Sequence, residues 1–580
     1  SKNFHKSKFF PRAKLNYEQN LLKKNDLKPA IIFKSENGYK TTLSWKKLNS
    51  SVEKVSSWLQ SNGIKKGDRV AAYLPNITET VIAYISTSAI GAVWSSCSPD
   101  FGTAGAIERF SQIDPKVLFI GDKYFYNGKK INIIKRLPEI LKKIPSIKKV
   151  VVVSYPGCRP HKKQNTKIAL FNWKEIIIND NKNKIKYSAS KFNDPLVILY
   201  SSGTTGKPKC ICHGTGGVLL QHNKELQIHC DVRENDRVFY FTTCGWMMWN
   251  WLVGSLSAGA TILLFDGFPM HKKDDLLFQL ASEEKVTLFG VSAKYIDVLK
   301  NNKVIPKKKY DLSSLRTICS TGSPLSKEGF KYIYKNVKKD VHLSSISGGT
   351  DIVSCFVLGN LFQSVQLGEI QNRGLGMNVD IFDEKGLSLK NKKGELVCKN
   401  PFPSMPVKFW NDDKDKKYKA AYFKKYNNVW HHGDYAKITK NGGFIIFGRS
   451  DTTLNPGGVR LGTAEIYNVV EQFKEIKESI VIGQSWQNDI RIVLFVVLNK
   501  GYHLTNTIKN KIKKTIRTNA SPRHVPSKII PVFDIPKTKN GKLVELAVKQ
   551  SIEGEKIKNL EALANPGSLD QFKNIKVLNE

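Results

Sequence analysis

Short runs of apolar, β-branched and aromatic residues recur through the first 450 positions, and segments of helix length separate them. We predict strands at 70–74, 117–121, 150–153, 195–200, 237–241, 260–265 and 287–291. Strands that alternate with helices along a chain pack into parallel sheets that carry helices on their faces. We therefore predict an α/β fold for this large N-terminal region.

The pattern changes near position 365. From there to about 450, turns rich in Gly, Asn and Asp separate short strands, which is typical of a small antiparallel or barrel-like β unit. Positions 451 to about 550 contain predicted helices at 465–473 and 506–518 and predicted strands at 479–482 and 490–498. We expect a large domain over 1–450 and a small α+β domain over 451–580. Its polar tail, 551–580, has no pattern that decides whether it is ordered.

The chain has 92 Lys and Arg against 50 Asp and Glu, which gives a formal net charge of +42. Such an excess is typical of proteins that bind nucleic acid or an anionic membrane. The lysines are spread over the whole length, however, without an arginine stripe, zinc-ligand spacing or an aromatic RNA-binding motif. The charge therefore favours a solvated lysine surface, and a basic nucleic-acid-binding protein is the alternative from a different class.

Two further features narrow the class of protein. The best membrane candidate, 81–98, contains Gly91 and several Ser and Thr, whereas a spanning helix needs about 20 mainly apolar residues. We expect a buried helix that leads into a strand, and no membrane insertion. The nine cysteines are odd in number and scattered, which favours a reducing compartment and a cytoplasmic protein. No second ligand pair accompanies Cys210, Cys212 and His213, so we expect no zinc site there.

The stretch 196–209, LVILYSSGTTGKPK, places an apolar strand directly before a small, hydroxylated and basic loop. Glycines let the backbone approach a ligand, and hydroxyl and ammonium groups at a strand end suit a polyphosphate. The spacing is not that of a Walker A loop, and Pro208 follows the lysine. By composition alone, a plain surface turn explains the loop equally well. The candidate phosphate ligands are Ser201, Ser202, Gly203, Thr204, Thr205, Gly206 and Lys207.

The ordered string YSSGTTGKPK resembles the phosphate loop of the adenylate-forming superfamily, which includes acyl-CoA synthetases, luciferases and the adenylation domains of peptide synthetases. The resemblance covers nearly the whole chain, and it implies a large adenylation domain and a small mobile C-terminal domain. The further motifs of that family follow in order: STGSPL at 320–325, SGGTD at 347–351, HHGDYA at 431–436, GRSDTTLNPGGVRLGTAEI at 448–466 and PKTKNGKLVE at 536–545.

The resemblance implies nucleotide-binding roles for the earlier motifs. Asp351 would hold Mg²⁺ where the family usually has Glu; its arm is one methylene shorter, but its oxygens are still hard ligands. Asp434 would accept hydrogen bonds from both ribose hydroxyls. The other implied contacts are Gly322, Ser323 and Pro324 beside adenine, and Gly349 and Thr350 beside phosphate.

The hinge motif would supply further contacts and the moving part. By resemblance, Arg449 contacts ribose or phosphate, and Arg460 is a second phosphate ligand. Asp451 would be the pivot about which the small domain rotates. Gly457 and Gly458 would let the pantetheine arm of coenzyme A pass close to the backbone.

Within the superfamily, the segments TTCGWMMWN at 242–250, GEIQNRGLGM at 368–377 and SPRHVP at 521–526 are most similar to synthetases that act on acetoacetate. In synthetases that act on acetate, a Trp two residues before the motif Thr closes the acyl pocket. Here that residue is Gly348, which would leave room for a longer acid. Trp246 and Met247 would line the rest of the pocket, although ordinary core packing explains them as well.

The implied reaction has two steps. A carboxylate attacks the α-phosphorus of ATP and expels pyrophosphate, and the thiol of coenzyme A then attacks the acyl-adenylate and releases AMP. Both partners of the first step are anions, so positive charge from Mg²⁺, the phosphate loop, Lys542 and Arg460 must offset their repulsion. Lys542 matches the family's catalytic lysine, and Thr350 and Arg460 are expected to act with it.

Acetoacetate, ATP and coenzyme A are the expected substrates. The alternative acids are acetate, propionate and butyrate, and the alternative to an enzyme of this family is a non-catalytic pseudoenzyme.

Overall fold

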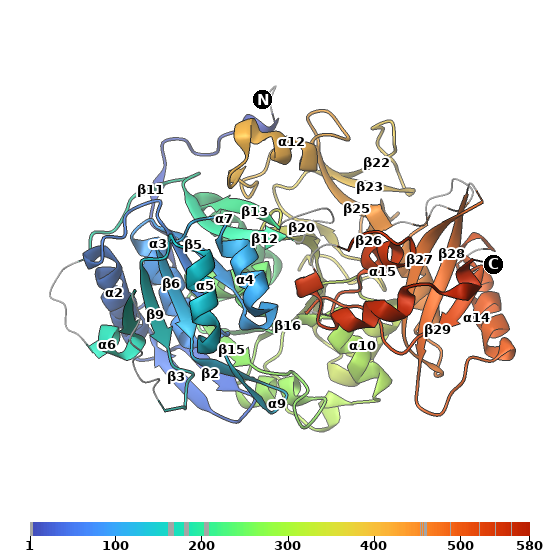
Figure 1. Ribbon diagram of the computed structural model, residues 1–580, viewed down its shortest axis with the longest axis horizontal. Coiled ribbons are helices and arrows are strands. Elements are labelled where there is room, and N and C mark those ends of the chain that lie inside the picture. Colours follow the sequence, from blue (N-terminus) through green and yellow to red (C-terminus); the bar gives the residue numbers. More distant parts are fainter. Residues whose placement is uncertain are drawn as a thin grey trace.

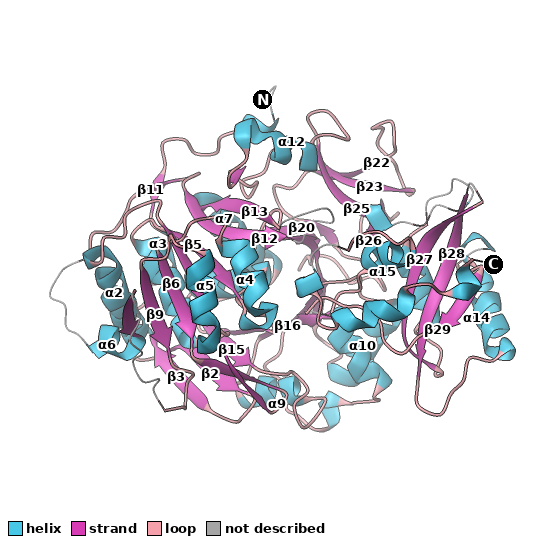
Figure 2. Ribbon diagram, in the orientation of Figure 1, coloured by secondary structure: helices cyan, strands magenta, loops and turns pink. Residues whose placement is uncertain are grey.

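The computed structural model describes residues 4–159, 168–178, 185–201, 208–452, 454, 456, 461–487, 489–520, 522–539, 541–557 and 560–579. Two large sheets with helices on their faces make up most of the chain, and the small C-terminal sheet lies at one end of the molecule (Figure 1). Figure 2 shows the helices and strands in the same orientation. The predicted α/β class is confirmed.

The first sheet has eight strands in the order β10-β9-β6-β4-β5-β12-β13-β24. The strands from β10 to β12 are parallel, as predicted, and β13 and β24 extend one edge antiparallel. The chain between β12 and β13 is too short for the crossover that a parallel neighbour needs, so β13 runs back along β12. The bounds are β10 Ala169–Asn172, β9 Lys149–Val153, β6 Val117–Gly121, β4 Arg69–Tyr73, β5 Val93–Cys97, β12 Pro195–Ser201, β13 Lys209–Gly214 and β24 Lys408–Phe409.

The second sheet has seven strands in the order β18-β17-β16-β14-β15-β2-β3. All neighbours are parallel except β2 and β3, which form an antiparallel edge from the N-terminal part of the chain. The bounds are β18 His342–Ser345, β17 Thr317–Thr321, β16 Leu288–Ser292, β14 Arg237–Tyr240, β15 Thr261–Asp266, β2 Pro29–Ser35 and β3 Lys40–Ser44.

Helices cover both faces of each large sheet, as β4 illustrates. Val70 and Ala72 contribute to a core shared with α2, α3, α8 and the second sheet, whereas Ala71 and Tyr73 contribute to a core with α4 and α5. Alternate residues of a strand face opposite sides, so a strand covered on both sides is apolar throughout. The helices of these layers are α2 Trp45–Ser61, α3 Thr78–Ala89, α4 Gly102–Phe110, α5 Leu137–Lys143, α7 Thr215–Asn223, α8 Met247–Gly254, α9 Leu276–Glu283, α10 Ala293–Asn301 and α11 Lys327–Tyr332.

The segment that had the strongest membrane-like pattern is part of these layers. It comprises most of the buried helix α3 and then β5, as expected from its Ser, Thr and Gly content. Across the described ranges, the structure contains no helix with the length and apolarity needed to cross a membrane.

The region from 365 to 450 is antiparallel, as the sequence predicted. Its main sheet has the order β22-β23-β25-β26, and a smaller sheet, β19-β20-β21, lies between this part and the second large sheet in the chain. Helix α12, Lys416–Tyr422, packs on β25. The bounds are β19 Ser347–Gly349, β20 Ser354–Leu358, β21 Asn372–Arg373, β22 Val379–Phe382, β23 Lys393–Cys398, β25 Trp430–Ile438 and β26 Phe444–Arg449.

The C-terminal part is a small α+β unit, as expected. Its sheet pairs β27, Ile476–Trp486, antiparallel with β28, Asp489–Leu498, and β28 parallel with β29, Lys528–Pro531. The helices are α13 Thr463–Val470, α14 Asn506–Asn519 and α15 Glu545–Ile552.

The polar tail, whose order the sequence did not decide, packs onto the small sheet. Leu563, Leu569, Phe572 and Leu578 are buried in one core with residues of β27 and β28. The ring of Phe572 lies edge-on to that of Phe495, with 5.0 Å between their centroids. Widely spaced apolar residues in a polar segment give no periodic signal, so only the folded sheet reveals their common partner.

A row of buried side chains between 213 and 229 holds the backbone of 350–359, which carries part of the SGGTD motif. Val353 has φ +48°, a conformation that is rare for a β-branched residue, so its hydrogen bond to this row helps to hold a strained turn. Part of the row, Lys224–His229, is a π-helix, a rare form that is frequent at functional sites. Three imidazoles donate to backbone carbonyls: His213 to Thr350 at 2.9 Å, His222 to Val353 at 2.8 Å and His229 to Gly359 at 2.8 Å.

Glu225 is the acceptor at the centre of this row. It is fully buried, and because a carboxylate has only acceptor sites it can satisfy several donors at once. It thereby ties α7 and α8 to the strand β20 that follows the motif. The donors are Gln221 Nε2 at 2.9 Å, Ser354 Oγ at 2.5 Å, the Cys355 backbone N–H at 3.0 Å and Trp251 Nε1 at 3.0 Å.

Replacing Glu225 with Leu should destabilise the large domain by about 2–4 kcal/mol, because several buried donors would lose their acceptor. The measurement is the denaturant midpoint of the large-domain unfolding transition. Glu225→Gln, which keeps one acceptor oxygen, is the matched variant and should cost less. Equal midpoints for the Leu variant and the parent chain would contradict the assigned role.

Candidate functional site

The predicted motifs meet at the carboxyl ends of the parallel strands. Ser96 at the end of β5 donates to the carbonyl of Cys244, which follows β14, at 2.6 Å, so the two large sheets touch there. Thr321 at the end of β17 donates to the carbonyl of Ile346, just before the SGGTD motif, at 3.0 Å. Ligands of open α/β sheets bind outside this edge. The candidate site is therefore where this fold class places a ligand.

The phosphate loop begins at this edge. Ser201 is the last residue of β12 and lies opposite Lys209 of β13. The Ser201 hydroxyl is buried and has no hydrogen-bond partner among the described residues. The other predicted loop residues, Ser202, Gly203, Thr204, Thr205, Gly206 and Lys207, lie outside the described residues.

The predicted adenine segment has an open surface. Gly322 has φ +94°, which L side chains rarely adopt. The nearest heavy atoms to a Cβ at this position, Lys542 Cε and Ser292 Cβ, would both be 3.9 Å away. Ser323 and Pro324 are exposed. The segment can therefore present its backbone to a flat ring, next to the lysine of the small domain.

The SGGTD backbone is fixed on its inner side. Burial lowers the pKa of His213 to about 4, so this imidazole is neutral and its Nε2–H donates to the Thr350 carbonyl. A Cβ at Gly349 would lie 3.7 Å from His432 Nε2, an ordinary contact. The Thr350 side chain is half-buried. The backbone of the motif is therefore held by His213, while the Thr350 side chain remains partly accessible.

Asp351, the predicted Mg²⁺ ligand, is held by two partners that the sequence did not connect to it. Tyr422 Oη donates to Asp351 Oδ1 at 2.6 Å, and Lys209 Nζ lies 3.5 Å from the same oxygen. Burial alone would raise the pKa of this carboxyl, but Lys209, His432 and the Tyr422 hydrogen bond bring the pKa below its usual value. The ring of Tyr422 stacks on Trp430, with 3.8 Å between centroids.

Asp351 fits the way in which Mg²⁺ binds to nucleotide sites. This cation commonly uses one or two carboxylates together with phosphate oxygens and water. Within the described residues, no group of three or more His, Cys, Asp or Glu could hold a metal ion by itself. A single ionised carboxylate at this edge is therefore a ligand that needs the oxygens of a bound nucleotide.

Asp434 and Arg449 are cross-strand partners on β25 and β26. Arg449 Nη1 donates to Asp434 Oδ1 and to the His432 carbonyl, both at 3.1 Å, which fixes the carboxylate. Gly433 has φ +81°, and a Cβ there would come within 2.7 Å of Arg449 Nη2. The positive φ favours glycine at this position of the HHGDYA motif, and a larger residue would also push the end of the Arg449 side chain aside.

Lys542 reaches this group from the small domain. Burial lowers its pKa; Asp434 opposes that shift and Arg449 reinforces it, so both charges lie close enough to act on the ammonium group. By its accessible surface Lys542 is nevertheless an exposed side chain, so the shift reflects the crowding of protein atoms around the ammonium group rather than exclusion of water. Lys542 Cε lies 3.9 Å from the position of a Cβ at Gly322, and the charges of Asp434 and Arg449 act on its ammonium group, although these residues are more than 90 positions apart from it in the chain.

The remaining hinge residues cannot be placed in the same detail. Gly457, Gly458 and Arg460 lie outside the described residues. The backbone of Asp451 belongs to the single turn Ser450–Thr452 between β26 and the small domain. This turn directly follows β26, and the hinge role of Asp451 stays a prediction.

The structure corrects the expectation for Gly348. A Cβ at this residue would lie 2.1 Å from the Ser354 carbonyl oxygen and 2.6 Å from Cys355 Cα. That direction is filled by the backbone of β20, which pairs with β19, so it offers no room for an acyl group. The glycine is required by the strand pairing, and the missing indole does not by itself create a pocket.

The two other predicted pocket residues differ in burial. Trp246 is half-buried, and its ring centroid lies 5.6 Å from that of Phe101, which follows β5. Met247 is 8% exposed and packs in the core between the two large sheets. Trp246 can therefore face a ligand at the strand ends, whereas core packing accounts for Met247.

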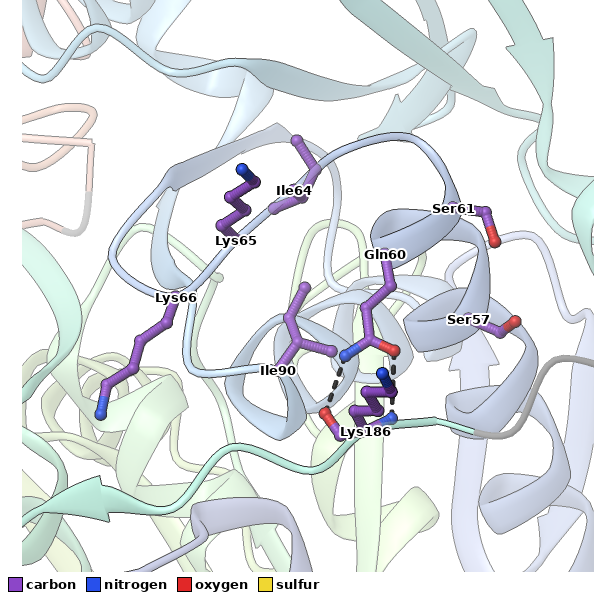
Figure 3. A pocket seen from close by; sticks show the side chains of 8 residues that line it. All are labelled: Ser57, Gln60, Ser61, Ile64, Lys65, Lys66, Ile90 and Lys186. Atoms are coloured by element: carbon purple, nitrogen blue, oxygen red, sulfur yellow. Dashed lines mark hydrogen bonds between the residues drawn. The ribbon is translucent and has the colours of Figure 1, made fainter.

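A cavity of about 420 Å³ lies away from all of these motifs. Gln60 closes part of it through two hydrogen bonds to the backbone of Lys186, at 2.7 and 3.1 Å (Figure 3). None of its lining residues belongs to a predicted motif, so it is not the candidate substrate site. The lining residues are Ser57, Gln60, Ser61, Ile64, Lys65, Lys66, Ile90 and Lys186.

Comparison with known proteins identifies the family. Residues 18–405 match the family of AMP-binding enzymes, and residues 465–542 match the C-terminal domain of AMP-binding enzymes. Over 576 residues the chain is 50% identical to an acetoacetyl-coenzyme A synthetase of Rhizobium meliloti (strain 1021), covering 99% of this chain and 88% of the relative. It is 42% identical to an acetoacetyl-CoA synthetase of Gallus gallus, covering 98% of this chain and 86% of that one.

A solved structure gives the same result. The acetoacetyl-CoA synthetase from Streptomyces lividans superposes with a TM-score of 0.92 at 38% identity, covering 99% of this chain and 88% of that chain. Agreement over both domains extends the likeness beyond the large sheets to the lysine-bearing C-terminal unit. The chain therefore belongs to the AMP-binding enzyme family and, within it, to the acetoacetyl-CoA synthetases.

Proposed function

We propose that this chain activates acetoacetate with ATP, through an acyl-adenylate, and transfers the acyl group to coenzyme A, with release of pyrophosphate and AMP. The observation that carries the proposal is the position of Lys542, which comes from the small domain to lie against the open Gly322 segment, where the charges of Asp434 and Arg449 act on it. The relatives at 42–50% identity bear the name of this activity. The chain is accordingly an acid–thiol ligase of the AMP-forming type.

The first step joins two anions, and the residues on this edge supply the charge that offsets their repulsion. The ammonium of Lys542 would face the phosphates, and Arg449 would hold ribose or phosphate beside Asp434. Fixed charges in a site shielded from water act more strongly than they would in bulk solvent. Thr350 would donate its hydroxyl to a phosphate oxygen from a backbone that His213 already holds.

Mg²⁺, when bound, would add positive charge to the phosphates, with Asp351 as its protein ligand. Lys209 and Tyr422 keep this carboxylate ionised and oriented. The phosphate loop 201–207 and Arg460 complete the proposed set of phosphate ligands, and Gly457 and Gly458 the proposed passage for coenzyme A.

We also propose a division into domains at 450/451, with Asp451 as the hinge. Thioester formation needs a path for coenzyme A to the adenylate, and rotation of the small domain would clear the place that Lys542 occupies. The cytoplasm is the proposed location, because all nine cysteines are free thiols, as is usual in a reducing compartment.

A panel of small acids tests the proposed substrate. With ATP and coenzyme A present, kcat/KM from pyrophosphate release should be higher for acetoacetate than for acetate, propionate or butyrate by about tenfold or more. A polar site discriminates strongly against analogues that lack the group it binds, and only acetoacetate carries the keto oxygen. Preference for butyrate would assign the chain to a different short acid.

Replacing Lys542 with Ala should lower adenylate formation by about 10²–10³-fold, the usual cost of losing one preorganised charge. Thioester formation from supplied acetoacetyl-adenylate should stay within a few-fold of the parent chain, because that step does not need the lysine. Exchange of labelled pyrophosphate into ATP measures the first half-reaction. Lys500→Ala, at an exposed lysine of the small domain, is the control. Equal losses in both half-reactions would remove Lys542 from its assigned step.

The pH profile of adenylate formation should report the same lysine. Burial and Arg449 outweigh Asp434 and lower the pKa of Lys542 from the ordinary value of 10.5, so its charge is lost at a lower pH than that of a surface lysine. Adenylate formation should therefore decline with rising pH below 10.5. Lys542→Arg, which keeps its proton, should be slower but lack this decline. A decline of the same midpoint in the Arg variant would mean that another group titrates.

A further inference from the structure

Lys539 anchors the turn that carries Lys542 to the large domain. Its ammonium group donates a hydrogen bond to the carbonyl of Asp100, and Nζ lies 5.1 Å from the ring centroid of Phe101. Asp100 and Phe101 belong to the single turn Pro99–Phe101, directly after β5 of the first large sheet. A side chain of the small domain thus reaches the same carboxyl edge that carries the candidate site.

The contact has the properties of a specific one rather than of a solvated surface lysine. Phe101 is 4% exposed, and a second cation, the guanidinium of Arg109, lies 4.3 Å from the same ring. Burial lowers the pKa of Lys539, and the nearby Asp100 opposes this shift. The attraction of a cation to a ring face and to a carbonyl oxygen is stronger when the cation is removed from water. The Lys539 ammonium group is therefore held in place by these two partners.

The turn transmits the position of Lys539 to Lys542. The Thr538 N–H donates to the Lys542 carbonyl at 2.8 Å, and the Lys542 N–H donates to Thr538 Oγ1 at 3.1 Å. The Gly541 N–H donates to the Thr538 carbonyl at 2.8 Å, with φ +79° at the glycine. Reciprocal hydrogen bonds close the turn, so neither lysine can shift its backbone without the other.

We propose that Lys539 is a positioning residue for adenylate formation: its contact with Asp100 and Phe101 holds the turn so that Lys542 stands beside Gly322 of the predicted adenine segment. The inference rests on the proposed function, because adenylate formation is the half-reaction that Lys542 would serve. Thioester formation from a supplied adenylate does not use Lys542 and is independent of the anchor.

Lys539→Met tests the anchor, because it removes the charge and keeps most of the stem. Pyrophosphate exchange into ATP should fall by about tenfold, the effect of losing one desolvated cation–π and hydrogen-bond contact. Thioester formation from supplied acetoacetyl-adenylate should stay within about twofold of the parent chain, since no cation at this position takes part in that step. Lys539→Arg should restore most of the exchange rate, because a guanidinium can both donate to the carbonyl and stack on the ring.

The control is Lys573→Met, at an exposed lysine whose ion pair, with Asp570, stays within the tail; it should change neither half-reaction. A merely structural role for Lys539 would lower both half-reactions together and would not be rescued by Arg. Either result, or an unchanged exchange rate in the Met variant, would overturn the proposal.

Hydrogen exchange of the substrate-free protein separates this inference from the proposed function. Lys539→Met should speed amide exchange at Gly541 and Lys542 by roughly several-fold. The turn opens more often once it has lost the contact with Asp100 and Phe101. This outcome does not depend on which reaction the enzyme performs. Unchanged exchange at these amides would overturn the anchor, whereas a parent chain that forms no adenylate with any short acid would overturn the proposed function alone.

Discussion

In the proposed reaction, positive charge from the large and the small domain has to meet at one edge of the large sheets, and the position of the small domain can be understood from that requirement. A carboxylate and a triphosphate repel each other, so neither the large domain alone nor a solvated lysine surface brings them together. Lys542, on the small-domain turn, would supply charge from one side, and Arg449, beside the Asp434 carboxylate on β25 and β26, from the other. Asp434 pairs with Arg449 at 3.1 Å, and its negative charge opposes the effect of Arg449 on the pKa of Lys542.

The large-domain and small-domain sides of the candidate site are held in place in different ways. On the large-domain side the motif backbone is held from behind by three imidazoles and by Glu225, all of which satisfy buried donors or acceptors. A network of this kind is rigid, because releasing any member leaves a buried polar group unpaired. The small-domain side contacts the large domain through side chains such as Lys539 that keep partial exposure. Such contacts are easier to break, as the proposed rotation of the small domain requires.

The net charge of the chain has little to do with this chemistry. Many of its lysines are exposed and pair with single carboxylates at the surface, as Lys573 does with Asp570, and such pairs contribute little stability. The lysines that matter are distinguished by their neighbours. Lys209 is paired with the half-buried Asp351 and lies over the ring of Tyr422, and the pKa of Lys542 is lowered by burial and by Arg449 against the effect of Asp434. Composition could not separate these positions from the rest.

The sequence by itself determined the α/β class, the order of the motifs and the identity of most candidate residues, because strand periodicity and ordered strings are local properties. What lies far apart in the chain was decided only by the tertiary structure. The pairing of Tyr422 with Asp351, the packing of the tail on β28 and the contact of Lys539 with Phe101 each join segments that no pattern links. Gly348 shows the limit most clearly: a missing side chain signals free space only if the Cβ direction is open, and here β20 fills it. The pairing of the strands decides where a Cβ points, and the linear sequence does not contain that information.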